Sequence, residues 1–146
     1  MDQDAVDILL VEDSPEDAEM TKRALRSQGL TNRLHHVKDG VEALDFLFGR
    51  GAYAGRDATN LPRVVLLDLK LPKVDGLEVL REIKNDPRTR VVPVVVMTSS
   101  REDSDLAASY RLGVNSFIVK PVTFNDFMVA VSKLGVYWLQ LNQPSA

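Results

Sequence analysis

The chain has 146 residues and a formal net charge of −3, a size that suits one globular domain with a single core. The acidic balance argues against a broad basic surface for nucleic acid, and the absence of cysteine excludes disulfides and thiolate zinc sites. The apolar runs are far shorter than the roughly 20 residues that span a bilayer, and the amino terminus lacks the basic start of a secretory signal. We therefore expect a cytoplasmic protein that binds neither nucleic acid nor a membrane.

Five short apolar runs predict five β-strands. In chain order they cover residues 8–11, 34–37, 64–67, 92–97 and 116–119. Four of them are continuously apolar, a pattern typical of strands that are buried on both faces of a parallel sheet. The run at 34–37 is weaker, because it contains His35 and His36, which we interpret as surface or edge residues.

A possible helix-capping residue follows each run, with an acidic residue three positions later. The pairs are Ser14 and Asp17, Asp39 and Glu42, Asp75 and Glu78, Ser100 and Asp103, and Thr123 and Asp126. Each approximates a capping box, in which the first side chain accepts a backbone N–H and the acid reaches back. Strand and helix thus alternate five times. We predict an α/β fold, a (βα)5 doubly wound five-stranded parallel sheet with helices on both faces.

The polar residues at the strand ends are expected to meet at one edge of this sheet. Glu12 and Asp13 follow the first strand, Asp68 ends the third, Thr98 ends the fourth and Lys120 ends the fifth. Open α/β sheets bind ligands at this carboxyl edge. Three clustered carboxylates repel one another unless their pKa values rise or a cation lies among them, and an all-oxygen ligand set suits Mg²⁺. The pattern predicts phosphoryl transfer onto Asp68, with the lysine and the hydroxyl holding phosphoryl oxygens.

These motifs, taken in order, resemble a response-regulator receiver domain of two-component signalling. The matching segments are Glu12-Asp13, residues 67–72 leading to Asp75-Gly76, residues 98–100, and residues 117–121. The resemblance extends over about residues 7–135 and is greatest to single-domain cyanobacterial phytochrome-type response regulators. It implies the flavodoxin-like strand order 2-1-3-4-5 and one receiver domain over residues 1–146, with a short carboxyl-terminal extension and no output domain.

The resemblance also implies a role for each matching residue. Asp68 would accept the phosphoryl group from a sensor histidine kinase, which in this subgroup would be phytochrome-like. Glu12, Asp13, Asp68 and the backbone carbonyl of Lys70 would hold Mg²⁺. Lys120 would pair with the phosphoryl oxygens, and its peptide bond to Pro121 would be cis. Thr98 would be the switch hydroxyl and Phe117 the aromatic that follows it, although Phe117 fits a plain core residue equally well.

Other functions remain as alternatives. A Mg²⁺-dependent phosphatase of the haloacid-dehalogenase type also forms an aspartyl phosphate, but that family places an acid two residues after the nucleophile, where this chain has Lys70. A flavodoxin-like cofactor module would need a phosphate-binding loop after the first strand, where residues 12–17 are mostly acidic. A degenerate receiver that serves as a scaffold would have no need of the whole acidic set.

The carboxyl-terminal segment suggests a homodimer. Phe124, Phe127, Val131 and Leu134 form one apolar stripe of a helix, but further apolar residues lie off that stripe. A contiguous apolar surface is rarely left in water. The residues that we expect at a two-fold interface are Leu106, Tyr110, Met128, Val136 and Tyr137. The alternative is that the segment after Gly135 folds back over the helix within one chain.

Overall fold

The computed structural model describes residues 6–27, 33–99, 111, 114 and 116–133. Its strands are β1 (Ile8–Val11), β2 (Leu34–Val37), β3 (Val64–Asp68), β4 (Val94–Thr98) and β5 (Phe117–Val119). Its helices are α1 (Pro15–Arg26), α2 (Gly40–Phe48), the short 3-10 helix η1 (Gly51–Tyr53), α3 (Gly76–Asn85) and α5 (Phe124–Lys133). Among these residues, every helix is too short or too polar to cross a membrane. The helix predicted to begin at Ser100 lies outside the described residues.

Within the described residues, five parallel strands form one sheet in the order β2-β1-β3-β4-β5, which confirms the predicted fold class and strand order. The predicted fourth strand began two residues early. It starts at Val94, because Pro93 has no N–H to donate to the sheet, and it runs one residue further, to Thr98.

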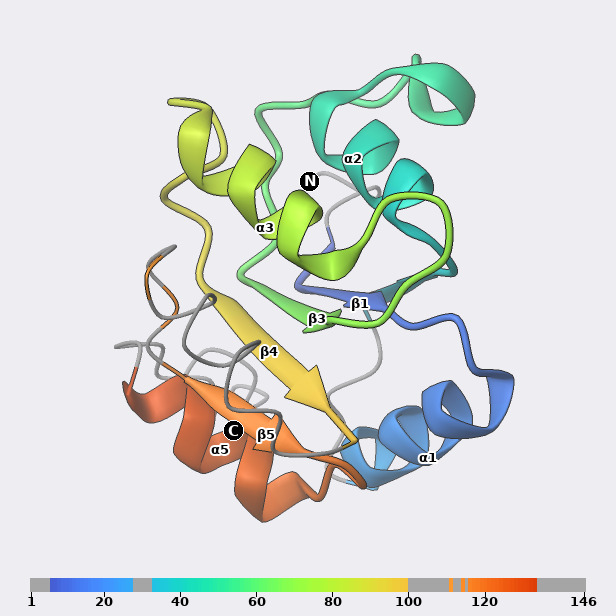
Figure 1. Cartoon of the computed structure of the whole chain (residues 1–146), viewed down its shortest axis with the longest axis vertical. Helices are drawn as coiled ribbons and strands as arrows, with labels where there is room; N and C mark the ends of the chain where they lie inside the picture. Colours follow the sequence, from blue (N-terminus) through green and yellow to red (C-terminus); the bar gives the residue numbers. More distant parts are fainter. Residues whose placement is uncertain (1–5, 28–32, 100–110, 112–113, 115, 134–146) are drawn as a thin grey trace, which may run out of the picture.

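The sheet is covered by α1 and α5 on one face and by α2 and α3 on the other (Figure 1). Alternate residues of β1 enter different cores: Leu9 and Val11 pack on the side of α2 and α3, whereas Ile8 and Leu10 pack on the side of α1 and α5. All four are 0% exposed. This two-sided burial is the reason for the continuously apolar strand sequences.

Three of the five predicted capping residues accept the expected hydrogen bond from the backbone three residues on. The bonds are Asp17 N to Ser14 Oγ (3.2 Å), Glu42 N to Asp39 Oδ1 (2.8 Å) and Asp126 N to Thr123 Oγ1 (3.0 Å). The prediction for Asp75 was wrong: it precedes α3, but its side chain makes no capping hydrogen bond. There the chain turns instead through a bond from Gly76 N to the Leu69 carbonyl, at 3.0 Å. The Ser100 pair lies outside the described residues.

The β2 histidines lie on an edge strand, as predicted, but both are half-buried rather than fully exposed. His35 is half-buried, stacks on Phe46 at 4.7 Å between ring centroids, and shares a hydrogen bond of 2.9 Å with the Tyr53 hydroxyl through Nε2. Tyr53 belongs to η1, in the long segment after α2, and its hydroxyl donates to Glu42 Oε2 at 2.7 Å. The 3-10 turn therefore packs against the edge strand, a tertiary contact between residues 18 positions apart.

Candidate functional site

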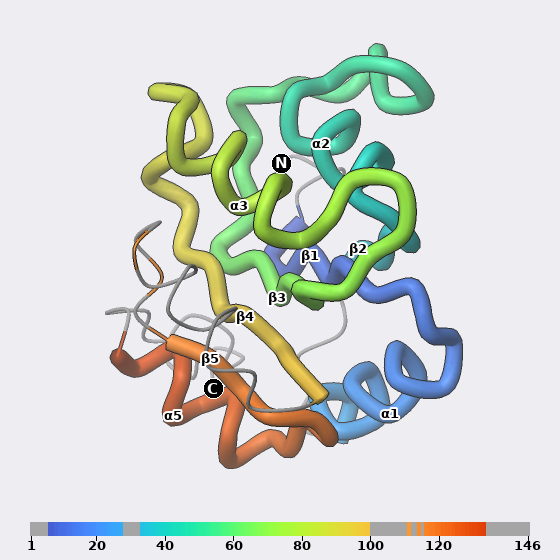
Figure 2. Tube along the Cα trace, viewed as in Figure 1, coloured from blue at the N-terminus to red at the C-terminus, as the bar shows by residue number. Residues whose placement is uncertain are grey.

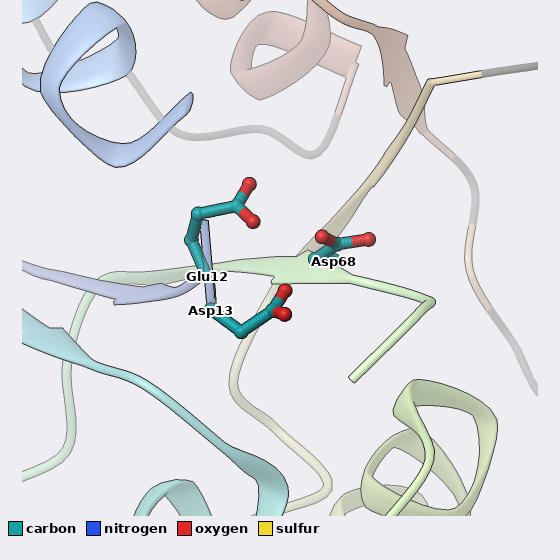
Figure 3. Close-up of side chains that lie close together, drawn as sticks. All are labelled: Glu12, Asp13 and Asp68. Atoms are coloured by element: carbon teal, nitrogen blue, oxygen red, sulfur yellow. The ribbon is translucent and has the colours of Figure 1, made fainter. Parts of the chain in front are cut away.

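Three carboxylates gather at the carboxyl edge of the sheet. Glu12 and Asp13 follow β1 and Asp68 ends β3, and Figure 3 shows them at the ends of these neighbouring strands. Each offers an oxygen such that the three oxygens lie within 4.8 Å of one another. Glu12 and Asp68 are only 1% and 6% exposed, whereas Asp13 is exposed. The cluster therefore has two buried members and one that opens to water.

The parallel register of the sheet brings these residues together. Val11 is paired with Leu67, so the next residues, Glu12 and Asp68, lie at the same level. Asp68 is paired with Met97 on β4, and Thr98 is paired with Val119 on β5, immediately before Lys120. A shift of one residue would turn each side chain to the opposite face. The apolar pattern of the strands thus fixes where the polar ends meet.

Lys120 reaches across this edge, as the sequence predicted. Its Nζ lies 2.5 Å from Glu12 Oε1, 2.9 Å from Asp68 Oδ2 and 3.1 Å from Asp17 Oδ2. The peptide bond to Pro121 is cis, as the resemblance implied. Asp17 was predicted only as the acid of the first capping pair, and its contact with Lys120 was missed. Its only sequence signal was its place in the first turn of α1, directly after the strand end.

Burial and charge act in opposite directions on Lys120 and Glu12. Burial raises the pKa of Glu12 from 4.5 to about 7, against the lowering effect of its hydrogen bond with Lys120. Burial lowers the pKa of Lys120, but the hydrogen bonds with Glu12 and Asp68 outweigh it and the net pKa lies above its usual 10.5. The single ammonium of Lys120 thus contacts three carboxylates, those of Glu12, Asp17 and Asp68. The oxygen-only set of Glu12, Asp13 and Asp68 fits a hard divalent cation such as Mg²⁺.

The remaining predicted site residues lie around this cluster. Lys70 is exposed, and its backbone N–H donates to Asp68 Oδ1 at 3.0 Å, so the chain turns directly over the carboxylate. Thr98 is 7% exposed, and its carbonyl accepts from Lys120 N at 2.8 Å. Phe117 is half-buried and packs against the core on the side of α2 and α3. Thr98 thus lies beside Lys120 at the carboxyl edge, and Phe117 lies two residues before Val119 on the neighbouring strand.

The predicted dimer residues can be followed only at Met128. Met128 is half-buried and packs against the core between the sheet and helices α1 and α5. Its neighbour Val129 is 48% exposed. The other four residues, Leu106, Tyr110, Val136 and Tyr137, lie outside the described residues.

Comparison with known proteins identifies one family over nearly the whole chain. The response regulator receiver domain matches residues 8–132. The probable methanogenesis regulatory protein FilR2 of Methanothrix harundinacea is 46% identical over 142 residues, which cover 97% of this chain and 88% of that protein. Response regulator Rcp1 of Synechocystis sp. is 40% identical over 133 residues, which cover 91% and 88%.

Solved structures show the same fold at similar length. The bacteriophytochrome response regulator AtBRR is 54% identical, with a TM-score of 0.86 over 95% of this chain and 99% of that one. The Mn²⁺-bound form of Rcp1 is 38% identical, with a TM-score of 0.73 over 95% and 98%. The phosphorylated cyanobacterial phytochrome response regulator RcpA is 37% identical, with a TM-score of 0.75 over 97% and 99%.

Proposed function

The chain belongs to the family of response-regulator receiver domains, and on that premise we propose that Asp68 accepts a phosphoryl group from a phosphohistidine of a sensor histidine kinase. One observation carries the proposal: Asp68 lies at the carboxyl edge of the sheet, with the Lys120 ammonium at 2.9 Å and the carboxylates of Glu12 and Asp13 beside it. The phosphorylated RcpA, of similar fold, supports it.

We assign the divalent cation to Glu12, Asp13, Asp68 and the backbone carbonyl of Lys70. When bound, Mg²⁺ would neutralise charge on the phosphoryl oxygens and on the carboxylates. The Mn²⁺-bound Rcp1 supports a divalent ion in a related receiver. The excess of carboxylates over the single Lys120 ammonium favours the same assignment, because their mutual repulsion falls when a cation lies among them.

The chain's own residues orient the transfer. An Asp68 carboxylate oxygen forms the new bond to phosphorus as the phosphorus–nitrogen bond of the phosphohistidine breaks, and the departing imidazole keeps the electron pair. Lys120 already lies 2.9 Å from Asp68 Oδ2 and remains close to the oxygens of the incoming group. Lys70 N donates to Asp68 Oδ1, which leaves the carboxylate with one defined orientation.

The proposed output is a two-state change at Thr98 and Phe117. An aspartyl phosphate adds nearly two negative charges and new acceptor oxygens, which attract the Thr98 hydroxyl. The space that this hydroxyl leaves would admit the ring of Phe117, which is half-buried before phosphorylation. Thr98→Ala should still become phosphorylated but should lose the phosphorylation-dependent change in partner binding. Unchanged partner binding by Thr98→Ala would contradict the coupling.

We further propose that residues 1–146 form a single receiver domain that acts through protein contacts, as a homodimer, downstream of a phytochrome-like kinase. The similarity to AtBRR and RcpA, both of them phytochrome response regulators, supports the choice of kinase. The 48% exposure of Val129 on α5 supports an apolar contact on that helix. Sedimentation equilibrium at micromolar concentration, with and without phosphorylation, tests the assembly, and a monomer in both states would refute it.

Intact-mass spectrometry tests the central proposal. Wild-type protein incubated with acetyl phosphate and Mg²⁺ should gain the mass of one phosphoryl group, and Asp68→Asn should gain none. Chelation of the cation should abolish the gain. The haloacid-dehalogenase alternative predicts turnover of a stable phosphomonoester such as p-nitrophenyl phosphate, whereas a receiver should not turn it over. Phosphorylation of Asp68→Asn at the wild-type rate would overturn the assignment of the acceptor.

A further inference from the structure

The loop between β3 and α3, residues 69–75, connects the proposed acceptor to the next helix. Its start is held by Leu69 N, which donates to the Met97 carbonyl at 3.3 Å, and by the bond from Lys70 N to Asp68. Its end is held by Gly76 N, which donates to the Leu69 carbonyl at 3.0 Å. Between these ends the loop passes beside the start of α2 (Figure 2). The start of α2 is therefore the element that can contact the middle of the loop.

Lys73, in the middle of this loop, has a φ of 67°, the left-handed region that favours glycine. No other non-glycine residue with positive φ occurs in the described part of the chain. Such a conformation in an L-residue persists only where surrounding contacts impose it, and these positions gather at functional sites. A tertiary contact must therefore offset the unfavourable backbone of Lys73.

The contact is with the first turn of α2. Lys73 Nζ lies 3.4 Å from Asp39 Oδ2, while Asp39 Oδ1 accepts from Glu42 N at 2.8 Å as the cap of α2. One carboxylate thus joins the helix start to the loop. Asp39 is only half-exposed, and its position is fixed by the capping bond, so Lys73 pairs with an anchored partner.

A glycine permits this close approach. Gly40 is the first residue of α2, and a Cβ there would lie 2.3 Å from the Val74 carbonyl oxygen and 2.8 Å from the Val74 Cβ. Both distances are far below van der Waals contact, so the backbone of Val74 rests directly on α2. The ion pair and this backbone contact are adjacent in both segments and hold the same part of the loop.

We propose that Asp39 and Lys73 are positioning residues, whose ion pair holds the 69–75 loop so that the carbonyl of Lys70 is already placed for the divalent cation. The inference rests on the function proposed above, because it assigns Lys70 to the cation. Lys70 lies three residues before Lys73 and is fixed on its other side by Asp68. When the pair is broken, the middle of the loop keeps only its backbone contact with Gly40, and the cation must complete the ordering of the loop as it binds.

Four variants separate positioning from simple electrostatics. Asp39→Asn keeps a capping side chain but loses the charge, Lys73→Gln loses the opposite charge, the double variant loses both, and Lys73→Arg keeps the pair. Through space, removing an acid should weaken Mg²⁺ binding, whereas removing a lysine should strengthen it. Positioning instead predicts that both single substitutions weaken Mg²⁺ binding, by about three- to fivefold for a pair whose lysine is largely exposed. It also predicts that the double variant binds Mg²⁺ no more weakly than either single variant.

The measurements are isothermal titration calorimetry with Mg²⁺ and amide hydrogen exchange of residues 69–75 in metal-free protein. We expect weaker binding and faster exchange of the loop in both single variants, wild-type values in Lys73→Arg, and unchanged far-ultraviolet circular dichroism in all. Opposite effects of the two single substitutions on affinity, or wild-type affinity in both, would overturn the inference. Phosphorylation of the wild-type protein by acetyl phosphate is measured in a separate experiment. A wild-type protein that binds Mg²⁺ but gains no phosphoryl mass would refute the proposed function, while the affinities of the variants would still decide the positioning role.

Discussion

Removing the exposed carboxylate of the cluster should make the metal-free protein more stable, not less. Asp13 contributes one of three carboxylate oxygens that lie within 4.8 Å of one another. Unlike Glu12, it has no ion pair with Lys120 among the described contacts. Asp13→Asn preserves the size of the side chain and removes one negative charge. In the absence of a cation, the substitution therefore relieves repulsion and breaks no described ion pair.

The magnitude follows from Coulomb's law. Two unit charges 4.8 Å apart repel by about 0.9 kcal/mol at the dielectric constant of water and by about 3.5 kcal/mol at an effective value of 20. Asp13 is exposed, which favours the lower figure, and Lys120 offsets part of the field of Glu12 and Asp68. We expect metal-free Asp13→Asn to gain about 1 kcal/mol in its free energy of unfolding, a rise of about 2–4 °C in Tm.

Mg²⁺ should reverse this order. At about 100 times its Kd, the cation stabilises the wild-type protein by about 2.7 kcal/mol, whereas a variant that binds about a hundredfold more weakly gains only about 0.4 kcal/mol. Urea unfolding at pH 7.5 and low ionic strength, with chelator and then with Mg²⁺, measures both states. Glu19→Gln on α1, an exposed acid whose contact with Arg26 is 3.7 Å, is the matched control and should change little. Metal-free Asp13→Asn that unfolds at lower urea than wild type would refute the repulsion argument.

Three further substitutions probe other parts of the site and the fold. Lys120→Gln should lower the metal-free free energy of unfolding by about 3–5 kcal/mol, because it leaves buried carboxylates without their counter-charge, and Mg²⁺ should restore part of the loss in urea unfolding. Burial lowers the pKa of His35 from 6.5, so the folded state resists protonation and the wild-type free energy of unfolding should fall as the pH drops below about 6.5. His35→Gln should flatten this dependence when urea midpoints are measured against pH. A variant with the wild-type pH dependence would contradict the burial of a neutral His35. Gly40→Ala should destabilise the protein by about 1–3 kcal/mol, because the new Cβ would lie 2.3 Å from the Val74 carbonyl oxygen. It should also weaken Mg²⁺ binding in calorimetry. Wild-type stability and affinity in this variant would contradict the contact.

The strands and the composition of the cluster could be predicted from the sequence because both depend on local patterns. Continuous runs such as residues 8–11 and 64–67 are apolar on both faces, and such runs suit only strands that are buried between two layers of helices. In a parallel sheet the residues after these runs share one edge, so the pattern of strands was enough to place Glu12, Asp68 and Lys120 together.

The tertiary structure alone decided which other residues take part. Asp17 contacts Lys120, Asp39 pairs with Lys73, and His35 bonds to Tyr53, and each contact joins segments between 18 and 103 positions apart. Residue periodicity reports which face of an element is buried, but it carries no information on which distant side chain lies opposite. The sequence by itself thus determined the sheet and the acidic edge, because hydrophobic burial follows local pattern. The partners of its polar side chains depend on the angles at which helices and loops pack, and only the folded chain sets those angles.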